Sequence, residues 1–391
     1  MAKKRVQKPV TPPAMTKKQL SRWQKQKRQE RLALAFVVGV VALVVLVLGF
    51  GYYQENVAKP NAPIARINGT PISANTWVKA MVLQSRNLDQ QLTYWENQRL
   101  SMSSADPDTQ AYLQSLIDQQ EQQLTQAKQQ LIFTVPDDLM AAELIRQEAQ
   151  KRGLVVTPEE VQAALVEIFQ PPAQQPVTDT ASTTPTPTPI PANAWQQNYK
   201  DFLASLKISE AEYQELVLLP GLQRDKLQRA LSETVPASGE QIRISHIVTD
   251  TEEAAKGILQ RVQAGEDFAA LAKELSSDSA TTEIGGDLGW YPRGILTTEY
   301  GKAFEDAAWS LQKGQVVTAP VQTYFGYHII KQTDRDANRP YDADKLSQLQ
   351  ENALNDWLDI QLASPAVERF QDSDKLFWVQ DQVSKALQPK K

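Results

Sequence analysis

Two histidines, His246 and His328, are the only imidazole side chains in this chain of 391 residues. Each lies in a short segment whose apolar residues alternate as in a β-strand, and a glycine-rich loop at 285–289 lies between them in the sequence. Imidazole titrates closest to neutral pH, so acid–base or hydrogen-bonding chemistry would involve this pair. A metal site formed with Asp278 is the weaker alternative, because no two of these ligands have the short spacing of a local pair.

Cysteine is absent from the sequence, which excludes disulfides, thiolate nucleophiles and cysteine-ligated zinc. The formal net charge is −5, but residues 1–31 carry eleven Lys or Arg and one Glu, which leaves −15 for the rest of the chain. An acidic majority of this size argues against nucleic acid as the main partner.

Residues 32–53 are a run of twenty-two uncharged residues rich in Val, Leu, Ala and Phe. A helix of this length can cross a hydrocarbon core of about 30 Å. A cleaved signal peptide has a shorter apolar region and a small-residue cleavage site, whereas Tyr52 and Tyr53 are typical of a membrane interface. We predict an uncleaved transmembrane signal-anchor, with residues 1–31 as a basic cytoplasmic tail and the rest of the chain outside the cytoplasm.

Most of residues 60–237 has the pattern of amphipathic helices. Asn68-Gly69 predicts the tight turn of a small hairpin over 64–72, and Ser73 predicts the cap of the helix that follows. Further helix starts are predicted at Asp106-Pro107, Pro136, Thr157 and Ser209.

Two other segments complete this helical part of the chain. Residues 171–191 contain seven prolines among Thr, Ser, Gln and Ala, a composition that buries too little apolar surface to fold. We interpret them as a flexible insertion in a surface loop, and a glycosylated or ligand-presenting stalk is the alternative. The segment from Asp342 to Leu387 is predicted to be helical again, and we expect residues 342–388 to pack on the helical domain.

Residues 238–335 have a different pattern of apolar residues, in which strand and helix periodicities alternate. In 241–248 the alternation directs His246 toward the apolar face of a strand, where it could also be only a hydrogen-bonded core residue. Thr249 to Glu252 predicts the capping box of a helix. Further helices are predicted around 268–275 and 303–311, and further strands over 316–321 and 327–331.

Six short motifs follow one another in this unit. They are Ile244-Ser245-His246-Ile247-Val248, Gly265-Glu266-Asp267-Phe268 with Leu271-Ala272, Ser276-Ser277-Asp278, Gly285-Gly286-Asp287-Leu288-Gly289-Trp290, Phe304-Glu305-Asp306-Ala307-Ala308 and Phe325-Gly326-Tyr327-His328-Ile329-Ile330. In this order they resemble the parvulin-type peptidyl-prolyl cis/trans isomerases. The resemblance implies an α+β fold, an antiparallel sheet with surrounding helices, and an enzyme that needs no cofactor.

The resemblance also implies two groups of site residues. The polar, catalytic cluster would be His246, Asp278, Thr323 and His328. The residues that bind the proline of the substrate would be Leu288, Leu296, Phe304, Trp290 and Tyr300. About four residues are inserted before Phe304 relative to the family, so Tyr300 competes with it for the aromatic wall. In the family the histidines chiefly hold the hydrogen-bond network and the pocket shape, so no proton shuttle is implied.

Prolyl isomerisation requires no covalent bond to break. The barrier of about 18–20 kcal/mol arises from the partial double bond of the peptide, and a site lowers it by binding the twisted amide better than either planar form. The loop from Ile247 to Glu253 contains no Lys or Arg but three acidic residues, so recognition of a phosphorylated substrate is not expected.

The helical segments resemble those of the membrane-attached or periplasmic PrsA- and SurA-like foldases of bacteria. This resemblance implies a chaperone domain at 60–237, a parvulin domain at 238–335 inserted before the C-terminal helices, and a single-pass location in the cell membrane. The expected partners are unfolded exported polypeptides with X-Pro bonds and, through the N-terminal helix, the lipid bilayer. The alternative is a non-catalytic holdase whose parvulin unit only docks clients. The sequence does not indicate the oligomeric state.

Overall fold

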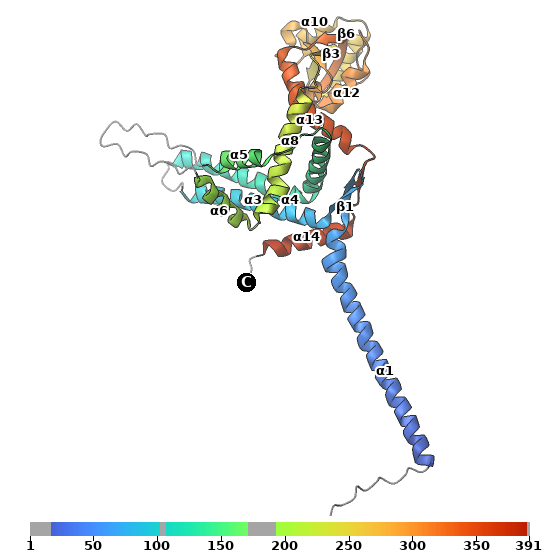
Figure 1. Cartoon of the computed structure of the whole chain (residues 1–391). Coiled ribbons are helices and arrows are strands. Elements are labelled where there is room, and N and C mark those ends of the chain that lie inside the picture. The colour runs from blue at the N-terminus through green and yellow to red at the C-terminus, as the bar shows by residue number, and fades with distance from the viewer. Residues whose placement is uncertain (1–16, 102–106, 171–192, 389–391) are drawn as a thin grey trace, which may run out of the picture.

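The computed structural model describes residues 17–101, 107–170 and 193–388. The predicted Asp106 cap, the insertion at 171–191 and the first part of the basic tail lie outside the described residues. Figure 1 shows three parts: a long N-terminal helix, a helical body and an α+β unit on the far side of that body.

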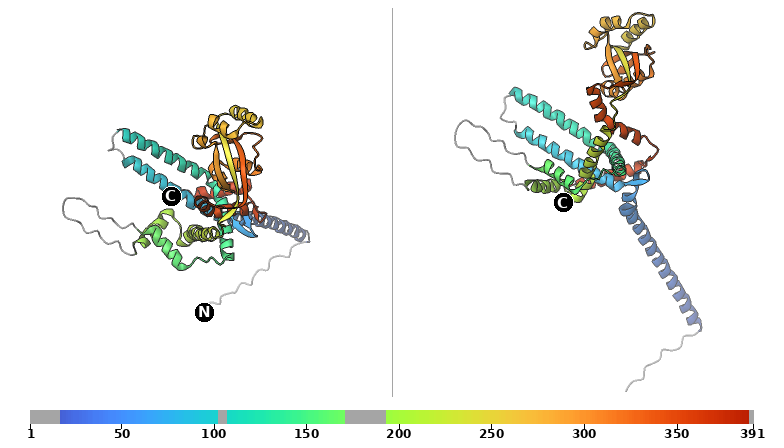
Figure 2. Two further views of the ribbon diagram at one scale, coloured as in Figure 1. Left: turned by 90° about the horizontal axis from the view of Figure 1, so that it is seen from above. Right: turned by 45° about the horizontal axis from the view of Figure 1, so that its top comes forward.

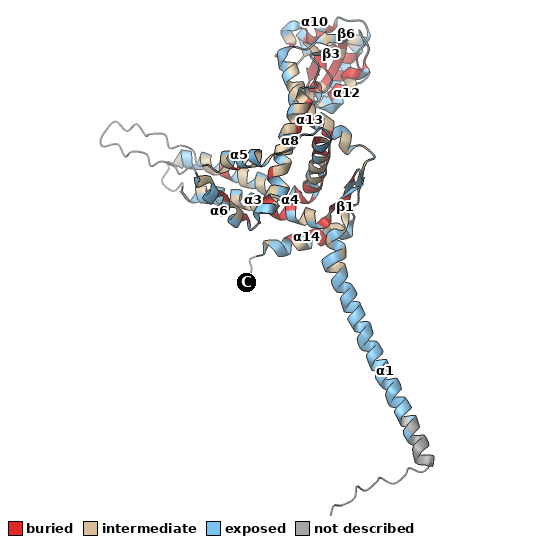
Figure 3. Ribbon diagram, in the orientation of Figure 1, coloured by how far each residue is buried: buried red, intermediate tan, exposed pale blue. Residues whose placement is uncertain are grey.

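The N-terminal helix α1 (Lys17–Tyr53) continues through η1 (Gln54–Ala58) and α2 (Lys59–Asn61). In the part of the chain that the structure describes, residues 27–61 are the one helical stretch long and apolar enough to cross a membrane, with a mean hydropathy of 3.1 over an 18-residue window. None of its apolar window is buried against the rest of the chain, as the pale blue ribbon of Figure 3 shows. The helical stretch 27–61 contains the uncharged run 32–53 that the sequence indicated, and it extends beyond that run at both ends.

A small sheet joins this helix to the body. Strands β1 (Pro63–Ile67) and β2 (Thr70–Ser73) form the predicted hairpin, and its turn residues have positive φ angles of 49° at Asn68 and 83° at Gly69. On the other side of β1 lies β7 (Val367–Arg369), also antiparallel. The C-terminal segment 342–388 is helical as predicted but is divided into two helices by β7, because Pro365 disfavours helix just before these residues and the open edge of β1 pairs with them.

The body itself is helical, as predicted. Its helices are α3 (Ala74–Ser101), α4 (Pro107–Lys151), α5 (Pro158–Phe169), α6 (Ala194–Leu206), α7 (Glu210–Tyr213) with η3 (Gln214–Leu218), α8 (Leu219–Ser232), α13 (Ala343–Leu362) and α14 (Ser373–Leu387). Helices α3 and α4 lie side by side and project as an arm in both views of Figure 2. The predicted capping boxes at Thr157 and Ser209 are both present.

Pro136 lies inside α4 and does not begin a helix as predicted. Proline removes one helical hydrogen bond and normally ends or kinks a helix. Here the neighbouring Val135 and Met140 are fully buried, so packing holds this region helical in spite of the missing bond. The larger core of the body joins Trp77 of α3 and Leu227 of α8 to residues of α13 and α14, such as Leu354 and Val379. A smaller core joins Leu165 of α5 to Tyr199 of α6.

The α+β unit has its own core and an antiparallel sheet. The strands are β3 (Ser238–Thr249), β4 (Asp287–Pro292), β5 (Val321–Thr323) and β6 (Gly326–Pro340), in the order β4-β3-β6-β5. The helices around them are α9 (Glu252–Gln263), α10 (Phe268–Leu275), η4 (Thr282–Ile284), α11 (Ile295–Tyr300) and α12 (Lys302–Ser310). Fully buried residues of the sheet, such as Ile244 and Ile329, pack in this core with Phe304 of α12.

Two local predictions in this unit were wrong. Thr251 caps α9, because its hydroxyl accepts a hydrogen bond from Ala254 N at 3.3 Å, whereas the predicted Thr249 is the last residue of β3. The predicted strand over 316–321 reduces to an isolated bridge at Val316, and β5 begins only at Val321. In both cases pairing with a longer neighbouring strand decided the boundary.

Strands β3 and β6 extend well beyond the other two strands. Their register runs from Thr249 opposite Tyr327 to Ser238 opposite Pro340. Helix α8 leads into β3, and β6 leads into α13. The chain therefore enters and leaves the α+β unit on two paired strands.

Candidate active site

A cavity of about 470 Å³ lies in the α+β unit where β3 ends and β6 begins. It is lined by His246, Val248, Ser277, Asp278, Ser279, Glu299, Tyr300, Phe325 and His328. These residues come from β3, from the loop after α10, from α11 and from the start of β6. Segments distant in the sequence are thus brought to one place by the pairing of β3 with β6.

The two histidines lie next to each other and are almost completely buried, with exposed fractions of 1% for His246 and 0% for His328. The sheet register pairs Val248 with His328 and His246 with Ile330. Their Nδ1 atoms are 3.3 Å apart, within hydrogen-bonding distance. The pairing of the two β-strands is therefore sufficient to place the two imidazoles side by side.

Both histidines have a further partner on the other ring nitrogen. His246 Nε2 lies 2.8 Å from Asp278 Oδ2, and His328 Nε2 lies 2.7 Å from Thr323 Oγ1. The structure thus brings together all four residues of the predicted polar cluster. Ser276 supports this arrangement, because its hydroxyl accepts hydrogen bonds from Val248 N and from Asp278 N and so ties the loop to β3.

The pKa values of the cluster favour neutral imidazoles beside an ionised carboxylate. Burial lowers the pKa of His246, although Asp278 beside it acts in the opposite direction. Burial, together with the proximity of His246, lowers the pKa of His328 to about 4. Partial burial acts to raise the pKa of Asp278, but hydrogen bonds from Thr281, His246 and Ala280 outweigh it and hold that pKa below its ordinary value.

These protonation states fix the direction of each hydrogen bond. An ionised Asp278 can only accept, so His246 carries its proton on Nε2 and its Nδ1 is an acceptor. His328 must then donate from Nδ1, and its Nε2 accepts from the hydroxyl of Thr323. That hydroxyl in turn accepts from Phe325 N at 3.0 Å.

No ring nitrogen of the pair remains for a proton transfer, because all four have protein partners. The imidazoles therefore act as fixed dipoles and as part of the cavity wall. This agrees with a reaction that needs shape and polarity but no general acid or base.

The aromatic side of the cavity is formed by Tyr300, whose ring faces both histidines edge-on, at 5.7 Å from His246 and 6.1 Å from His328. Phe304 lies behind it, fully buried, with ring centroids 4.6 Å apart and planes inclined by 24°. Phe325 closes the opposite edge at 6.1 Å from the Tyr300 ring. An apolar ring held between these side chains would also face the imidazole pair.

The other predicted binding residues do not line the cavity. Leu296 is fully buried and Leu288 is partly buried against the same core. Trp290 lies at another place on β4, where the Arg339 guanidinium stacks on its ring at 4.5 Å and Lys345 donates to its carbonyl. The sequence motif did not separate core positions from cavity positions, because both are apolar.

One residue of the polar network was missed by the sequence analysis. Thr281 is buried, and its hydroxyl donates to Asp278 Oδ2. The spacing of three residues from Asp278 was the available signal, because it is typical of a hydroxyl that closes a turn.

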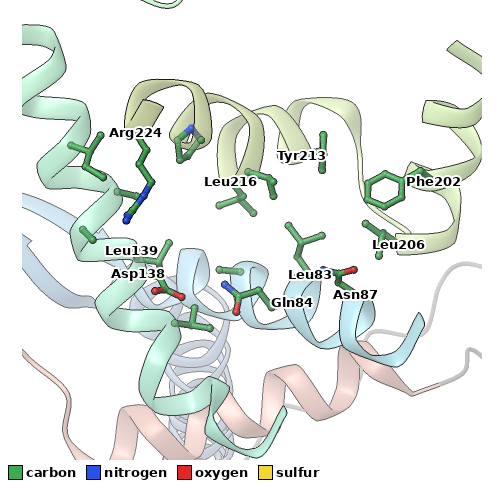
Figure 4. A pocket seen from close by; sticks show the side chains of 18 residues that line it. Leu83, Gln84, Asn87, Asp138, Leu139, Phe202, Leu206, Tyr213, Leu216 and Arg224 are labelled. Atoms are coloured by element: carbon green, nitrogen blue, oxygen red, sulfur yellow. The ribbon is translucent and has the colours of Figure 1, made fainter. Parts of the chain in front are cut away.

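A second cavity, of similar size, lies in the helical body between α3, α4, α6 and the segment 213–224 (Figure 4). Its walls are mainly apolar, with Leu83 of α3 facing Leu216 across the opening. Polar side chains stand at its edges: Gln84, Asn87, Asp138 and Arg224. An apolar cavity with a polar margin is the usual form of a site for an apolar ligand or side chain.

Comparison with known proteins finds family matches for two segments of the chain. Residues 244–334 match the family described as the PPIC-type PPIASE domain, and residues 21–138 match the SurA-like N-terminal domain. The chain is 32% identical over 211 residues to the foldase protein PrsA of Caldanaerobacter subterraneus subsp. tengcongensis, covering 50% of this chain and 55% of that protein. It is 47% identical over 100 residues to the foldase protein PrsA of Geobacillus sp., covering 26% and 34%.

Among solved structures, the crystal structure of a peptidylprolyl isomerase (PrsA) from Bacillus anthracis aligns with 64% of this chain and 95% of that chain, at 22% identity and a TM-score of 0.30. The chain spans about half or less of the length of the two curated relatives. The family matches confirm the resemblance that the sequence motifs indicated. The chain therefore combines a segment that matches the PPIC-type PPIASE domain with one that matches the SurA-like N-terminal domain, and it is similar in sequence to foldase proteins PrsA.

Proposed function

We propose that the chain is a peptidyl-prolyl cis/trans isomerase that acts on unfolded polypeptides. The observation that carries this proposal is the cavity at the imidazole pair, which combines an aromatic wall with fixed polar groups and leaves no ring nitrogen free for acid–base work. Such a site can accept the proline ring and bind the amide in its twisted form. Each 1.36 kcal/mol of preference for that form gives about a tenfold increase in rate.

The site residues have separate roles in this proposal. His246, Asp278, Thr323 and His328 hold the polar floor, and Tyr300 receives the proline ring. Phe304 and Leu296 support Tyr300 from the core, and Leu288 belongs to the same apolar layer. Spontaneous isomerisation takes tens to hundreds of seconds, so even modest catalysis is measurable.

The test uses the full chain, purified in detergent, and a short peptide with one X-Pro bond. Exchange between cis and trans peptide signals is measured by NMR as the protein concentration is raised. We expect the exchange rate to increase in proportion to the protein. An exchange rate equal to the spontaneous one would reject the isomerase and favour the alternative, a non-catalytic holdase.

We infer a chaperone role for the helical body, formed by residues 60–237 together with 342–388. The support is the apolar cavity of Figure 4, which is wide enough for an apolar side chain of a client and has polar groups at its edges. We expect Leu216→Gln to reduce the suppression of aggregation of a chemically unfolded probe protein. The matched control is Ile360→Gln, an exposed apolar residue of α13 outside this cavity. Equal effects of the two substitutions would reject the assignment.

We also propose that the N-terminal helix anchors the protein in the cell membrane and that residues after 53 lie outside the cytoplasm. The support is the apolar stretch at 27–61 and the basic residues that precede it, which remain on the cytoplasmic side by the positive-inside rule. Protease added to intact cells should then digest the α+β unit. Protection of that unit in intact cells, with digestion after lysis, would reverse the topology.

A further inference from the structure

Thr281 has a position that its sequence did not reveal. Its side chain is 8% exposed and lies at the bottom of the loop that follows α10. Its hydroxyl donates to Asp278 Oδ2 and lies 3.4 Å from His246 Nε2. One oxygen of the carboxylate therefore binds a hydroxyl and an imidazole together.

The carboxylate of Asp278 is held on both of its oxygens. Oδ2 accepts from His246 and Thr281, and Oδ1 accepts from Ala280 N at 3.1 Å. Without the Thr281 hydroxyl, Oδ2 would have the imidazole as its one protein partner among the described residues. The carboxyl group could then rotate, and the imidazole would lose a fixed acceptor.

The backbone of Thr281 is anchored to the same strand as His246. Its carbonyl accepts from Gly286 N at 2.8 Å, and the carbonyl of Gly286 accepts from His246 N at 2.8 Å. Thr281 also donates from its own N to the Asp278 carbonyl at 3.3 Å. One loop therefore holds both the backbone and the ring of His246. Thr281 takes part in both connections, through its carbonyl to Gly286 and through its hydroxyl to Asp278.

We propose that Thr281 is a positioning residue for the imidazole pair. Its hydroxyl fixes the rotamer of Asp278, and Asp278 fixes the tautomer and the orientation of His246. This proposal rests on the proposed isomerase activity for its kinetic consequences, but its effect on the imidazole does not depend on activity. Thr281 acts through Asp278 and does not line the cavity.

The test compares Thr281→Val, which keeps the shape and removes the hydroxyl, with Thr281→Ser, which keeps the hydroxyl. The readouts are the ring nitrogen signals of His246 by NMR with ¹⁵N-labelled histidine, and the isomerisation of an X-Pro peptide. We expect Thr281→Val to lower kcat about tenfold, the loss expected for one hydrogen bond to a charged group, with a much smaller change in KM. We expect its His246 Nε2–H signal to broaden or to show both tautomers. Thr281→Ser should retain a single tautomer and kcat within about twofold.

Thr282→Val is the neighbouring control, because the Thr282 hydroxyl donates to the backbone carbonyl of Asp278 and not to its carboxylate. It should leave the His246 signals unchanged.

If Thr281→Val does not fold, Thr281→Ala takes its place with the same expected results. Unchanged His246 signals in the valine or alanine variant, or equal losses in valine and serine, would overturn the proposal. Absence of isomerase activity in the unsubstituted chain would reject the proposed function, and the NMR comparison would still decide the role of Thr281.

Discussion

The ring of Tyr300 stacks on the ring of Phe304, with centroids 4.6 Å apart and planes inclined by 24°. Tyr300 lines the cavity and is half-buried, whereas Phe304 is fully buried in the core behind it. The two aromatic residues therefore have complementary roles, in which the outer ring meets the ligand and the inner ring holds the outer one. They also pack edge-on against the imidazoles, so the aromatic wall and the polar floor support each other.

These separate roles predict different results for the two alanine variants. Tyr300→Ala should weaken the binding of a proline peptide about tenfold, with a change in stability below about 2 kcal/mol, because it removes a half-buried ring. Phe304→Ala should lower the free energy of unfolding by about 3–5 kcal/mol, because it leaves a cavity in the core. Peptide titration by NMR and thermal unfolding measure both. Equal loss of stability in the two variants would contradict the layered arrangement.

Removal of the His246 ring should affect activity and stability together. His246→Ala leaves the buried Nδ1–H of His328 without its partner, at a cost of about 1–3 kcal/mol, and removes one of the two hydrogen bonds to Oδ2 of Asp278. We expect a lower melting temperature and a large loss of isomerisation. If both quantities match those of the unsubstituted chain, the role assigned to His246 is wrong.

The stability of the α+β unit should fall as the pH is lowered from 7 to 4. In the unfolded chain His328 takes up a proton near its ordinary pKa of 6.5, whereas in the folded chain it does so only near pH 4. The folded state binds fewer protons in this window, so stability is complete above about pH 6.5 and decreases toward the folded pKa, by roughly 3 kcal/mol at 1.36 kcal/mol per unit.

The measurement is chemical unfolding of the full chain followed by a probe in the α+β unit, at several pH values between 7 and 4. His328→Gln lacks the titrating group and should show a much flatter dependence. An equally steep dependence in that variant would assign the effect to other groups, such as His246, whose pKa is also lowered by burial.

Two glycines of the α+β unit provide a matched pair. A Cβ on Gly286 would lie 2.1 Å from the carbonyl oxygen of His246, and its φ is +75°, so Gly286→Ala meets both a clash and backbone strain. Gly314 has a similar φ of +86° but open space around it. We expect losses of unfolding free energy of about 1–2 kcal/mol for Gly314→Ala and about 2–5 kcal/mol for Gly286→Ala. Denaturant unfolding would show this order, and the reverse order would contradict the close approach of the loop to His246.

The local features were the most predictable from the sequence. The turn at Asn68-Gly69 and the capping boxes at Thr157 and Ser209 depend on neighbouring residues alone, and all three are present. The continuation of α4 through Pro136 and the short strand β7 depend on partners far away in the sequence. Composition and periodicity do not contain that information, so the predicted helix start at Pro136 was wrong and β7 was not predicted.

The same distinction applies to the site. The motifs contain His246, Asp278 and His328, the family resemblance added Thr323, and the structure brings the four together. Whether an apolar residue lies in a core or on a cavity wall depends on side-chain packing, so Leu296 and Tyr300 could not be separated from the sequence. The role of Thr281 depends on how the loop after α10 closes, and the sequence signals it only through the spacing of three residues from Asp278.

The paired strands that lead into and out of the α+β unit have a consequence for how such a protein can be built. Ser238 and Pro340 are register partners, so the two ends of the inserted unit lie only one strand spacing apart. A turn of a few residues could bridge that gap, and the core shared by Leu227 and Leu354 would keep both of its halves. The unit can thus be removed or exchanged as a cassette between two helices that remain in place, so that the α+β unit and the helical body can change independently on one scaffold.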